Sequence, residues 1–258
     1  MPRFAANLTM LFGDCDFMER FGRASHAGFK AVEYMFPYPY ETEQLAEKLR
    51  TNGLTQVLFN LPAGDWEAGE RGIALLPDRV GEFQAGVGRA IAIAKALSCG
   101  RVNCLVGFTP KEVPPDKARE TLVGNLRFAA EALKKERIAL LVESLNTRDF
   151  PGFYLSRTCE VLSLLKEVGH ANLSYQYDVY HMQVMEGDLT ETARRNIAAI
   201  GHIQIADNPG RHEPGTGEVN FANLFRFIDD AGYKGYIGCE YKPLGLTEDG
   251  LGWLRPYL

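Results

Sequence analysis

The stretch Ile138-Ala139-Leu140-Leu141-Val142-Glu143 is an apolar run that ends in a single carboxylate. On both sides of it, seven further short runs have the length and the aliphatic, β-branched or aromatic content of buried strands. They cover residues 4–8, 31–34, 54–60, 102–106, 173–178, 202–206 and 236–240. The sequence therefore predicts eight buried strands, spread over the whole chain.

The segments between these runs have apolar residues every three or four positions, the spacing of a helix with one buried face. Helix starts and ends are also marked, by Pro114-Pro115-Asp116 and by the glycines at 28, 53, 169 and 232. Alternating strands and helices predict a parallel sheet, and eight such strands can close into a barrel without a free edge. We predict one α/β domain over residues 1–258, a (β/α)8 TIM barrel.

An open doubly wound sheet is the main alternative to a barrel. Such sheets usually carry a glycine-rich phosphate loop after the first strand, but residues 9–14 of this chain contain no such loop. Two connections are long, residues 61–79 and 207–220. In a barrel both would lie at the C-terminal ends of the strands, where barrel enzymes carry their active sites.

The composition favours some kinds of partner over others. The net charge is −5 and no basic block occurs, which argues against a nucleic-acid partner. No stretch reaches the roughly 20 apolar residues that span a bilayer, and the N-terminus lacks the pattern of a signal peptide. Five cysteines without a C-x-x-C pair suggest reduced thiols. We expect a cytoplasmic protein that binds neither nucleic acid nor membrane.

The last four predicted strands lead to Glu143, Asp178, Gln204 and Glu240, separated by 35, 26 and 36 residues. Each separation is close to one strand–helix unit, so the four side chains should meet at the mouth of a barrel. Three buried carboxylates repel one another unless a cation balances them. An all-oxygen ligand set favours Mg²⁺ or Mn²⁺ over Zn²⁺. Alternatively, a single acid at a strand end can cap the next helix or form a surface ion pair, but the regular spacing favours a shared metal site.

Three further residues are candidates for substrate binding. His181 lies just after the sixth strand and can donate a hydrogen bond near the metal, although an interior structural histidine is the alternative. Arg211, in the long loop after the seventh strand, can hold a substrate carboxylate or simply be solvated. Lys242 follows the eighth strand and also favours an anionic substrate. We interpret His202 as a residue of the core or one that supports a metal ligand, and Glu33 as structural.

Several motifs of the chain resemble those of the hydroxypyruvate isomerase family of xylose isomerase-like barrels. They are Asn60-Leu61-Pro62-Ala63-Gly64-Asp65-Trp66, Ala68-Gly69-Glu70-Arg71-Gly72, Tyr177-Asp178-Val179-Tyr180-His181-Met182-Gln183, Gln204-Ile205-Ala206-Asp207-Asn208-Pro209 and Gly238-Cys239-Glu240-Tyr241-Lys242-Pro243. The resemblance covers essentially the whole chain. It implies that Glu143 and Glu240 are the acid/base pair, and that these two residues with Asp178 and Gln204 hold the metal. The related sugar epimerases have a histidine where this chain has Gln204, which favours the isomerases of small acids.

The resemblance implies a metal-dependent isomerisation of hydroxypyruvate to 2-hydroxy-3-oxopropanoate (tartronate semialdehyde) through an enediol. The expected partner is a small hydroxy or oxo acid, and a homodimer is the assembly we consider. Three alternatives stay open. An isomerase of 2- and 3-oxo-tetronates would use the same site. A barrel endonuclease is disfavoured by the acidic balance and the few histidines, and a non-catalytic sugar-acid-binding protein by the paired carboxylates.

Overall fold

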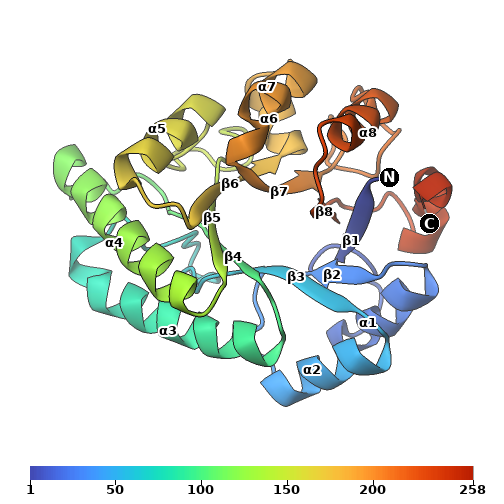
Figure 1. Ribbon diagram of the computed structural model, residues 1–258, viewed down its shortest axis with the longest axis horizontal. Helices are drawn as coiled ribbons and strands as arrows, with labels where there is room; N and C mark the ends of the chain where they lie inside the picture. The colour runs from blue at the N-terminus through green and yellow to red at the C-terminus, as the bar shows by residue number, and fades with distance from the viewer. Residues whose placement is uncertain (258) are drawn as a thin grey trace.

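Eight parallel strands form a closed barrel in the computed structural model, which describes residues 1–257 (Figure 1). β1 (Arg3–Asn7) pairs with both β2 (Ala31–Glu33) and β8 (Tyr236–Cys239), and this closes the sheet. The strands between them are β3 (Thr55–Asn60), β4 (Arg101–Cys104), β5 (Ala139–Glu143), β6 (Leu173–Asp178) and β7 (Ile200–Ile205). Each overlaps one predicted run, so the prediction of a (β/α)8 barrel is confirmed.

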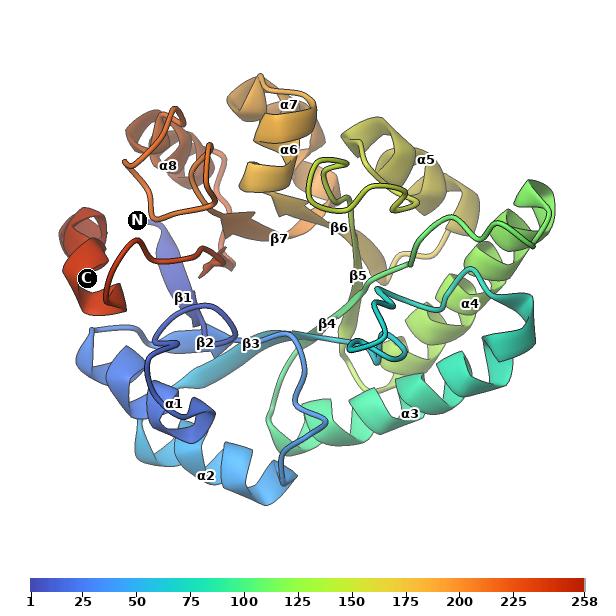
Figure 2. The ribbon, with the colours of Figure 1, turned by 180° about the vertical axis from the view of Figure 1, so that it is seen from behind.

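Helices surround the barrel in both views (Figures 1 and 2). They are α1 (Phe17–His26), α2 (Thr42–Thr51), α3 (Val80–Ala96), α4 (Pro115–Lys135), α5 (Thr158–Val168), α6 (Val179–Met185), α7 (Leu189–Asn196) and α8 (Phe221–Asp230). Short 3₁₀ segments η1 (Pro77–Arg79) and η2 (Ile197–Ala199) precede α3 and β7. Two helices, α6 and α7, separate β6 from β7. Between β8 and residue 257, η3 (Thr247–Tyr257) is a 3₁₀ segment, and it contains Pro256.

The main core lies between the barrel and these helices. The buried residues of α3 and α4 include Val87 and Leu126, which belong to the apolar stripes expected from the sequence. Gly169 ends α5 with a φ of 63°, a left-handed conformation that glycine adopts without strain. These apolar stripes pack each helix against the outside of the sheet. A different set of side chains fills the inside of the barrel.

Inside the barrel, side chains change from apolar to polar toward the C-terminal ends of the strands. Ala5, Ala31 and Leu141 belong to a small buried apolar cluster. Since side chains alternate across a strand, residues two positions further on the same strands face the same side. These residues are Asn7, Glu33 and Glu143, all buried. The barrel therefore has an apolar layer below and a polar layer at its mouth.

Figure 2 looks onto the connections that follow the strands, including the teal loop near β4 and the orange loop near α8. The second of these, residues 207–220, is organised by the buried side chain of Asp207. Its carboxylate accepts backbone N–H bonds from Asn208, Gly215, Gly217 and Val219, at 2.8 to 3.1 Å. Within residues 1–257, no helix has the length and apolar character needed to cross a bilayer.

Candidate active site

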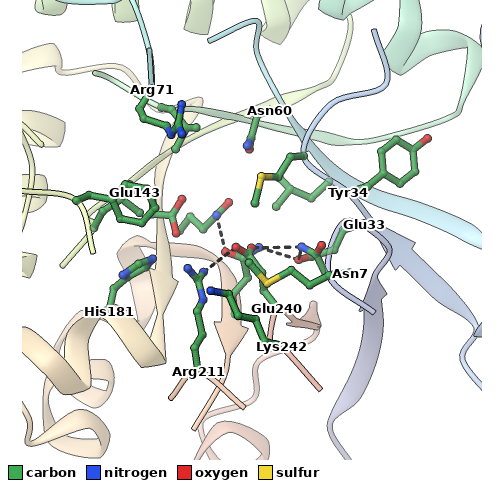
Figure 3. A pocket seen from close by; sticks show the side chains of 18 of the residues that line it. Asn7, Glu33, Tyr34, Asn60, Arg71, Glu143, His181, Arg211, Glu240 and Lys242 are labelled. Carbon is green, nitrogen blue, oxygen red and sulfur yellow. Dashed lines mark hydrogen bonds and ion pairs between the residues drawn. The ribbon is translucent and has the colours of Figure 1, made fainter. Parts of the chain in front are cut away.

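A cavity of about 190 Å³ opens at the mouth of the barrel (Figure 3). Its lining includes Glu33, Glu143, Gln204 and Glu240 from the strand ends. Both long loops contribute as well, through Trp66, Arg71 and Arg211. Pockets for drug-sized ligands typically measure roughly 300–1,000 Å³, so this cavity suits a small metabolite.

Two of the predicted site residues, Glu143 and Asp178, end neighbouring strands and are buried. Oε2 of Glu143 accepts a hydrogen bond from Nδ2 of Asn103, at 3.2 Å. Oδ1 of Asp178 caps α6 by accepting from the backbone N–H of Tyr180, at 2.8 Å. Its other oxygen, Oδ2, is buried without a hydrogen-bond donor among the described residues. Such an atom is costly to bury unless a positive charge lies beside it.

His181 lies beside Asp178, with 3.6 Å between its Nε2 and Oδ2 of Asp178. Nδ1 of His181 accepts a hydrogen bond from the backbone N–H of Asn146, at 3.1 Å. A neutral imidazole with an accepting Nδ1 carries its proton on Nε2. Burial lowers the pKa of His181 well below its ordinary value, and the charge of Arg211 adds to this effect. The ring is thus neutral and presents an N–H toward the acidic side chains.

The other two predicted ligands, Gln204 and Glu240, lie side by side. Nε2 of Gln204 donates to Oε2 of Glu240 and to Oε1 of Glu33, the second bond measuring 2.7 Å. The amide oxygen of Gln204 instead accepts from Nε2 of Gln176, at 2.6 Å. The structure thus brings Gln204 to the site, but with its nitrogen rather than its oxygen toward the carboxylates.

The three carboxyl groups have pKa values above their ordinary range. Burial, followed by the charges of Glu240 and Asp178, raises the pKa of Glu143 well above its ordinary value. Burial also raises the pKa of Asp178, and it raises that of Glu240 to about 8, in both cases against the lowering effect of Arg211. A carboxyl group with a pKa of about 8, such as that of Glu240, takes up and releases protons near neutral pH, as general acids and bases must.

Arg211 joins the site from the loop after β7. Its Nη2 atom lies 2.8 Å from Oε1 of Glu240 and 3.5 Å from Oδ2 of Asp178. The side chain is buried, and its guanidinium carbon lies 5.1 Å from the centre of the Tyr180 ring. The solvated alternative considered from the sequence is therefore wrong. Lys242 also lines the cavity, but its side chain is exposed.

Glu33 lines the cavity and forms hydrogen bonds with other residues of the site, which the sequence did not indicate. It accepts hydrogen bonds from Nδ2 of Asn7 (3.0 Å), Nε2 of Gln204 (2.7 Å) and Nε2 of His202 (2.7 Å). Asn7 also donates to Oε2 of Glu240, at 3.2 Å. Asn7 was not identified from the sequence, although it too ends a strand with a polar side chain. A search for polar strand ends in the first half of the chain could have found it.

Two of the four predicted ligands, Glu143 and Asp178, lie with His181 close enough together to share one metal ion. Glu143, Asp178 and His181 each place one possible ligand atom within 4.8 Å of the others. Oδ2 of Asp178 accepts no hydrogen bond within residues 1–257 and has only the more distant charge of Arg211, at 3.5 Å, so it gives such an ion an atom to bind. The proton on Nε2 of His181 prevents that nitrogen from acting as a ligand in its present hydrogen-bonded state. Carboxylate oxygens are thus the better candidates.

A family model described as a xylose isomerase-like TIM barrel matches residues 21–257. The chain belongs to the xylose isomerase-like TIM barrel family. Among the relatives in this family, the hydroxypyruvate isomerase of Escherichia coli (strain K12) is 54% identical over 257 residues, which cover 100% of both chains. The 2-oxo-tetronate isomerase of Cupriavidus necator (strain ATCC 17699) is 48% identical, over 100% of this chain and 99% of its own.

One solved structure is similar to this chain along its whole length. It is the crystal structure of an AP endonuclease, family 2, from Brucella melitensis, with a TM-score of 0.97 and 45% identity. The match covers 100% of this chain and 99% of that one. The resemblance expected from the motifs is confirmed, and the full-length relatives include isomerases.

Proposed function

We propose that this chain isomerises hydroxypyruvate to 2-hydroxy-3-oxopropanoate. The observation that carries the proposal is that two buried glutamates, Glu143 and Glu240, line one small cavity and both have raised pKa values. The full-length likeness to the hydroxypyruvate isomerase of Escherichia coli supports it. A non-catalytic binding site would have no need for two such carboxyl groups.

The reaction moves one proton between adjacent carbons. One glutamate carboxylate removes a proton from C3 of hydroxypyruvate, and the electrons of the broken C–H bond form the C2–C3 double bond. The C2 carbonyl oxygen takes up a proton to give the enediol, and this proton is balanced by the one that the C3 hydroxyl gives up in the next step. A proton is then delivered to C2 while the C3 hydroxyl loses its own, which yields the aldehyde. The other glutamate supplies the proton at C2. No electrons leave the substrate, so the reaction needs no redox cofactor.

A divalent cation, Mg²⁺ or Mn²⁺, is part of the proposal. Glu143, Asp178, Gln204 and Glu240 would hold it, and Oδ2 of Asp178, which accepts no hydrogen bond from the described residues, supports this assignment. For Gln204 to bind through oxygen, its amide has to turn over and exchange its present bond to Gln176. When bound, such a cation polarises the carbonyl and hydroxyl oxygens and stabilises the enediolate. His181 would donate from Nε2, while Arg211 and Lys242 would give the pocket a positive side.

The 2-oxo-tetronate isomerase of Cupriavidus necator supports a second candidate, the same reaction on an acid one carbon longer. The name of the Brucella structure raises the endonuclease alternative again. We place it last, because a net charge of −5 and a cavity of about 190 Å³ suit a small acid better than a nucleic-acid backbone.

The decisive experiment is a turnover assay of the purified chain with both acids, with Mg²⁺, with Mn²⁺ and with a chelator. We expect isomerisation of at least one acid that stops on chelation, and the larger kcat/KM identifies the preferred substrate. If neither acid is isomerised with either metal, the proposed function is wrong. Binding to abasic DNA at moderate salt would instead favour the endonuclease. The cytoplasmic location and the homodimer stay predictions, and sedimentation of the purified chain tests the second.

A further inference from the structure

Three cationic side chains line the cavity, and they differ in how their charge is balanced. Arg211 is paired with Glu240 and Asp178. Lys242 is exposed, so water screens its charge. Arg71 is half-buried, and within residues 1–257 it has no carboxylate at ion-pair distance. Arg71 is therefore the guanidinium of this cavity whose charge remains available to an anion.

The guanidinium of Arg71 is held firmly from one side. Its Nη1 donates to the backbone carbonyl oxygens of Trp66 (2.9 Å) and Glu70 (2.7 Å). Its central carbon lies 3.7 Å from the centre of the Trp66 ring. Within the described chain, Nε and Nη2 donate to no protein atom. These two nitrogens form one edge of the guanidinium, the arrangement that binds the two oxygens of a carboxylate.

The loop that carries Arg71 is itself fixed in place. The carboxylate of Glu70 accepts the backbone N–H of Asp65 and pairs with Arg79. Gly72 has a φ of 126°, and a Cβ there would lie 2.0 Å from the carbonyl oxygen of Leu105. The loop thus packs against the segment after β4 at a point where only glycine fits. Such a support sets the position of Arg71 before a ligand arrives.

Asn60 provides a second donor on the same side. Its Oδ1 accepts from Nδ2 of Asn103, at 3.2 Å, which orients the amide and leaves its own nitrogen for the cavity. Asn103 donates in turn to Glu143, at 3.2 Å. Figure 3 shows Arg71 and Asn60 on one side of the cavity, and Arg211 and Lys242 on the other.

We propose that Arg71 binds the substrate carboxylate through its free edge, with Asn60 as an additional donor. This inference rests on the proposed function, because it assumes an acid substrate. It assigns the anchoring role to the loop after β3, whereas the sequence suggested Arg211 and Lys242 for it. A carboxylate held there leaves the neighbouring carbons free to extend toward Glu143 and Glu240.

The test compares Arg71→Met, Arg71→Lys and Arg89→Met in the full-length chain with Mn²⁺. Losing a charge-assisted pair should raise KM for the acid by about 10- to 100-fold while kcat changes much less. Arg71→Lys should recover part of this loss, because it keeps the charge. Arg89→Met is the matched control, since Arg89 also stacks on an aromatic ring (Tyr38, 4.8 Å) and donates to a carbonyl oxygen, but lies outside the cavity lining. Its KM should not change.

Two further measurements keep the two proposals separate. Dihydroxyacetone carries a hydroxymethyl group in place of the carboxylate, so its inhibition constant should be the same for wild type and Arg71→Met. Pyruvate binding, measured by calorimetry, should also weaken in Arg71→Met. If this weakening is found but the wild type turns over neither acid, only the proposed function is wrong and the role of Arg71 stands. An unchanged KM and unchanged pyruvate binding in Arg71→Met overturn the inference. So does a KM increase that appears in Lys242→Met instead.

Discussion

Nη2 of Arg211 lies 2.8 Å from Oε1 of Glu240 and points toward Asp178 as well, at 3.5 Å, so one guanidinium balances two buried carboxylates. The backbone makes this possible, because Gly210 and Arg211 both have positive φ values, 97° and 60°. The loop after β7 reverses direction around these two residues, since Asp207 and His212 on either side of them form an antiparallel bridge. A divalent cation bound by the carboxylates would be attracted to the same negative charge that now holds Arg211.

We therefore expect Arg211→Met to bind Mn²⁺ more tightly than the wild type when substrate is absent. Removing one positive charge a few ångströms from the ligands should increase affinity by about tenfold, or about 1.4 kcal/mol. Calorimetric titration measures this directly. Arg23→Met is the control, since Arg23 also pairs with two carboxylates, Asp14 and Glu248, but outside the cavity. Weaker Mn²⁺ binding in Arg211→Met would show that Arg211 positions the ligands rather than competing with the ion.

The raised pKa of Glu240 predicts how stability depends on pH in the chelator-treated protein. Burial raises this pKa from 4.5 to about 8 in the folded chain. The folded protein therefore keeps a proton that the unfolded chain releases between these values. The free energy of unfolding must fall as pH rises through this window, by at most about 1.4 kcal/mol per pH unit for one group.

Urea unfolding between pH 5 and 8.5, with a chelator present, tests this dependence. Glu240→Gln cannot titrate and should give a shallower decline than the wild type. Equal slopes for the two proteins would show that Glu240 does not hold the extra proton. Adding Mn²⁺ should reduce the decline in the wild type, because metal binding favours the ionised carboxylates.

Glu143→Gln and Glu240→Gln should each lower kcat by about 10²- to 10⁴-fold, because each removes a group that accepts or donates the transferred proton. The circular dichroism spectrum should stay that of the wild type, since the amide has nearly the same shape. Glu213→Gln is the matched control: Glu213 is also buried and accepts the backbone N–H of Leu244, at 3.1 Å, but does not line the cavity. Full activity in Glu240→Gln would remove Glu240 from the acid/base pair.

The sequence predicted the barrel because each strand is a local apolar run and each helix has a local stripe. It also placed Glu143, Asp178, Gln204 and Glu240 correctly at strand ends, since their spacing follows the strand–helix repeat. The orientation of the Gln204 amide could not be predicted from the sequence, because it depends on a hydrogen bond to Glu33, which lies 171 residues away. The pairing of Arg211 could not be foreseen either, because it depends on the path of an irregular loop with positive φ values.

Gly238→Ala should disturb the site although residue 238 bears no functional group. A Cβ at this position would lie 2.3 Å from Oε1 of Glu33, so the carboxylate would have to leave its bonds to Gln204 and His202. Overpacking of this kind costs typically about 1–3 kcal/mol, and turnover should fall because Gln204 loses its support. Gly88→Ala in α3 is the control, because nothing lies within 4 Å of a Cβ there. It should stabilise the chain by about 0.5–1 kcal/mol, as alanine does in a helix. Chemical denaturation measures the stability of Gly238→Ala, and the turnover assay measures its activity. If both equal those of the wild type, then Glu33 does not need its present position to support the site.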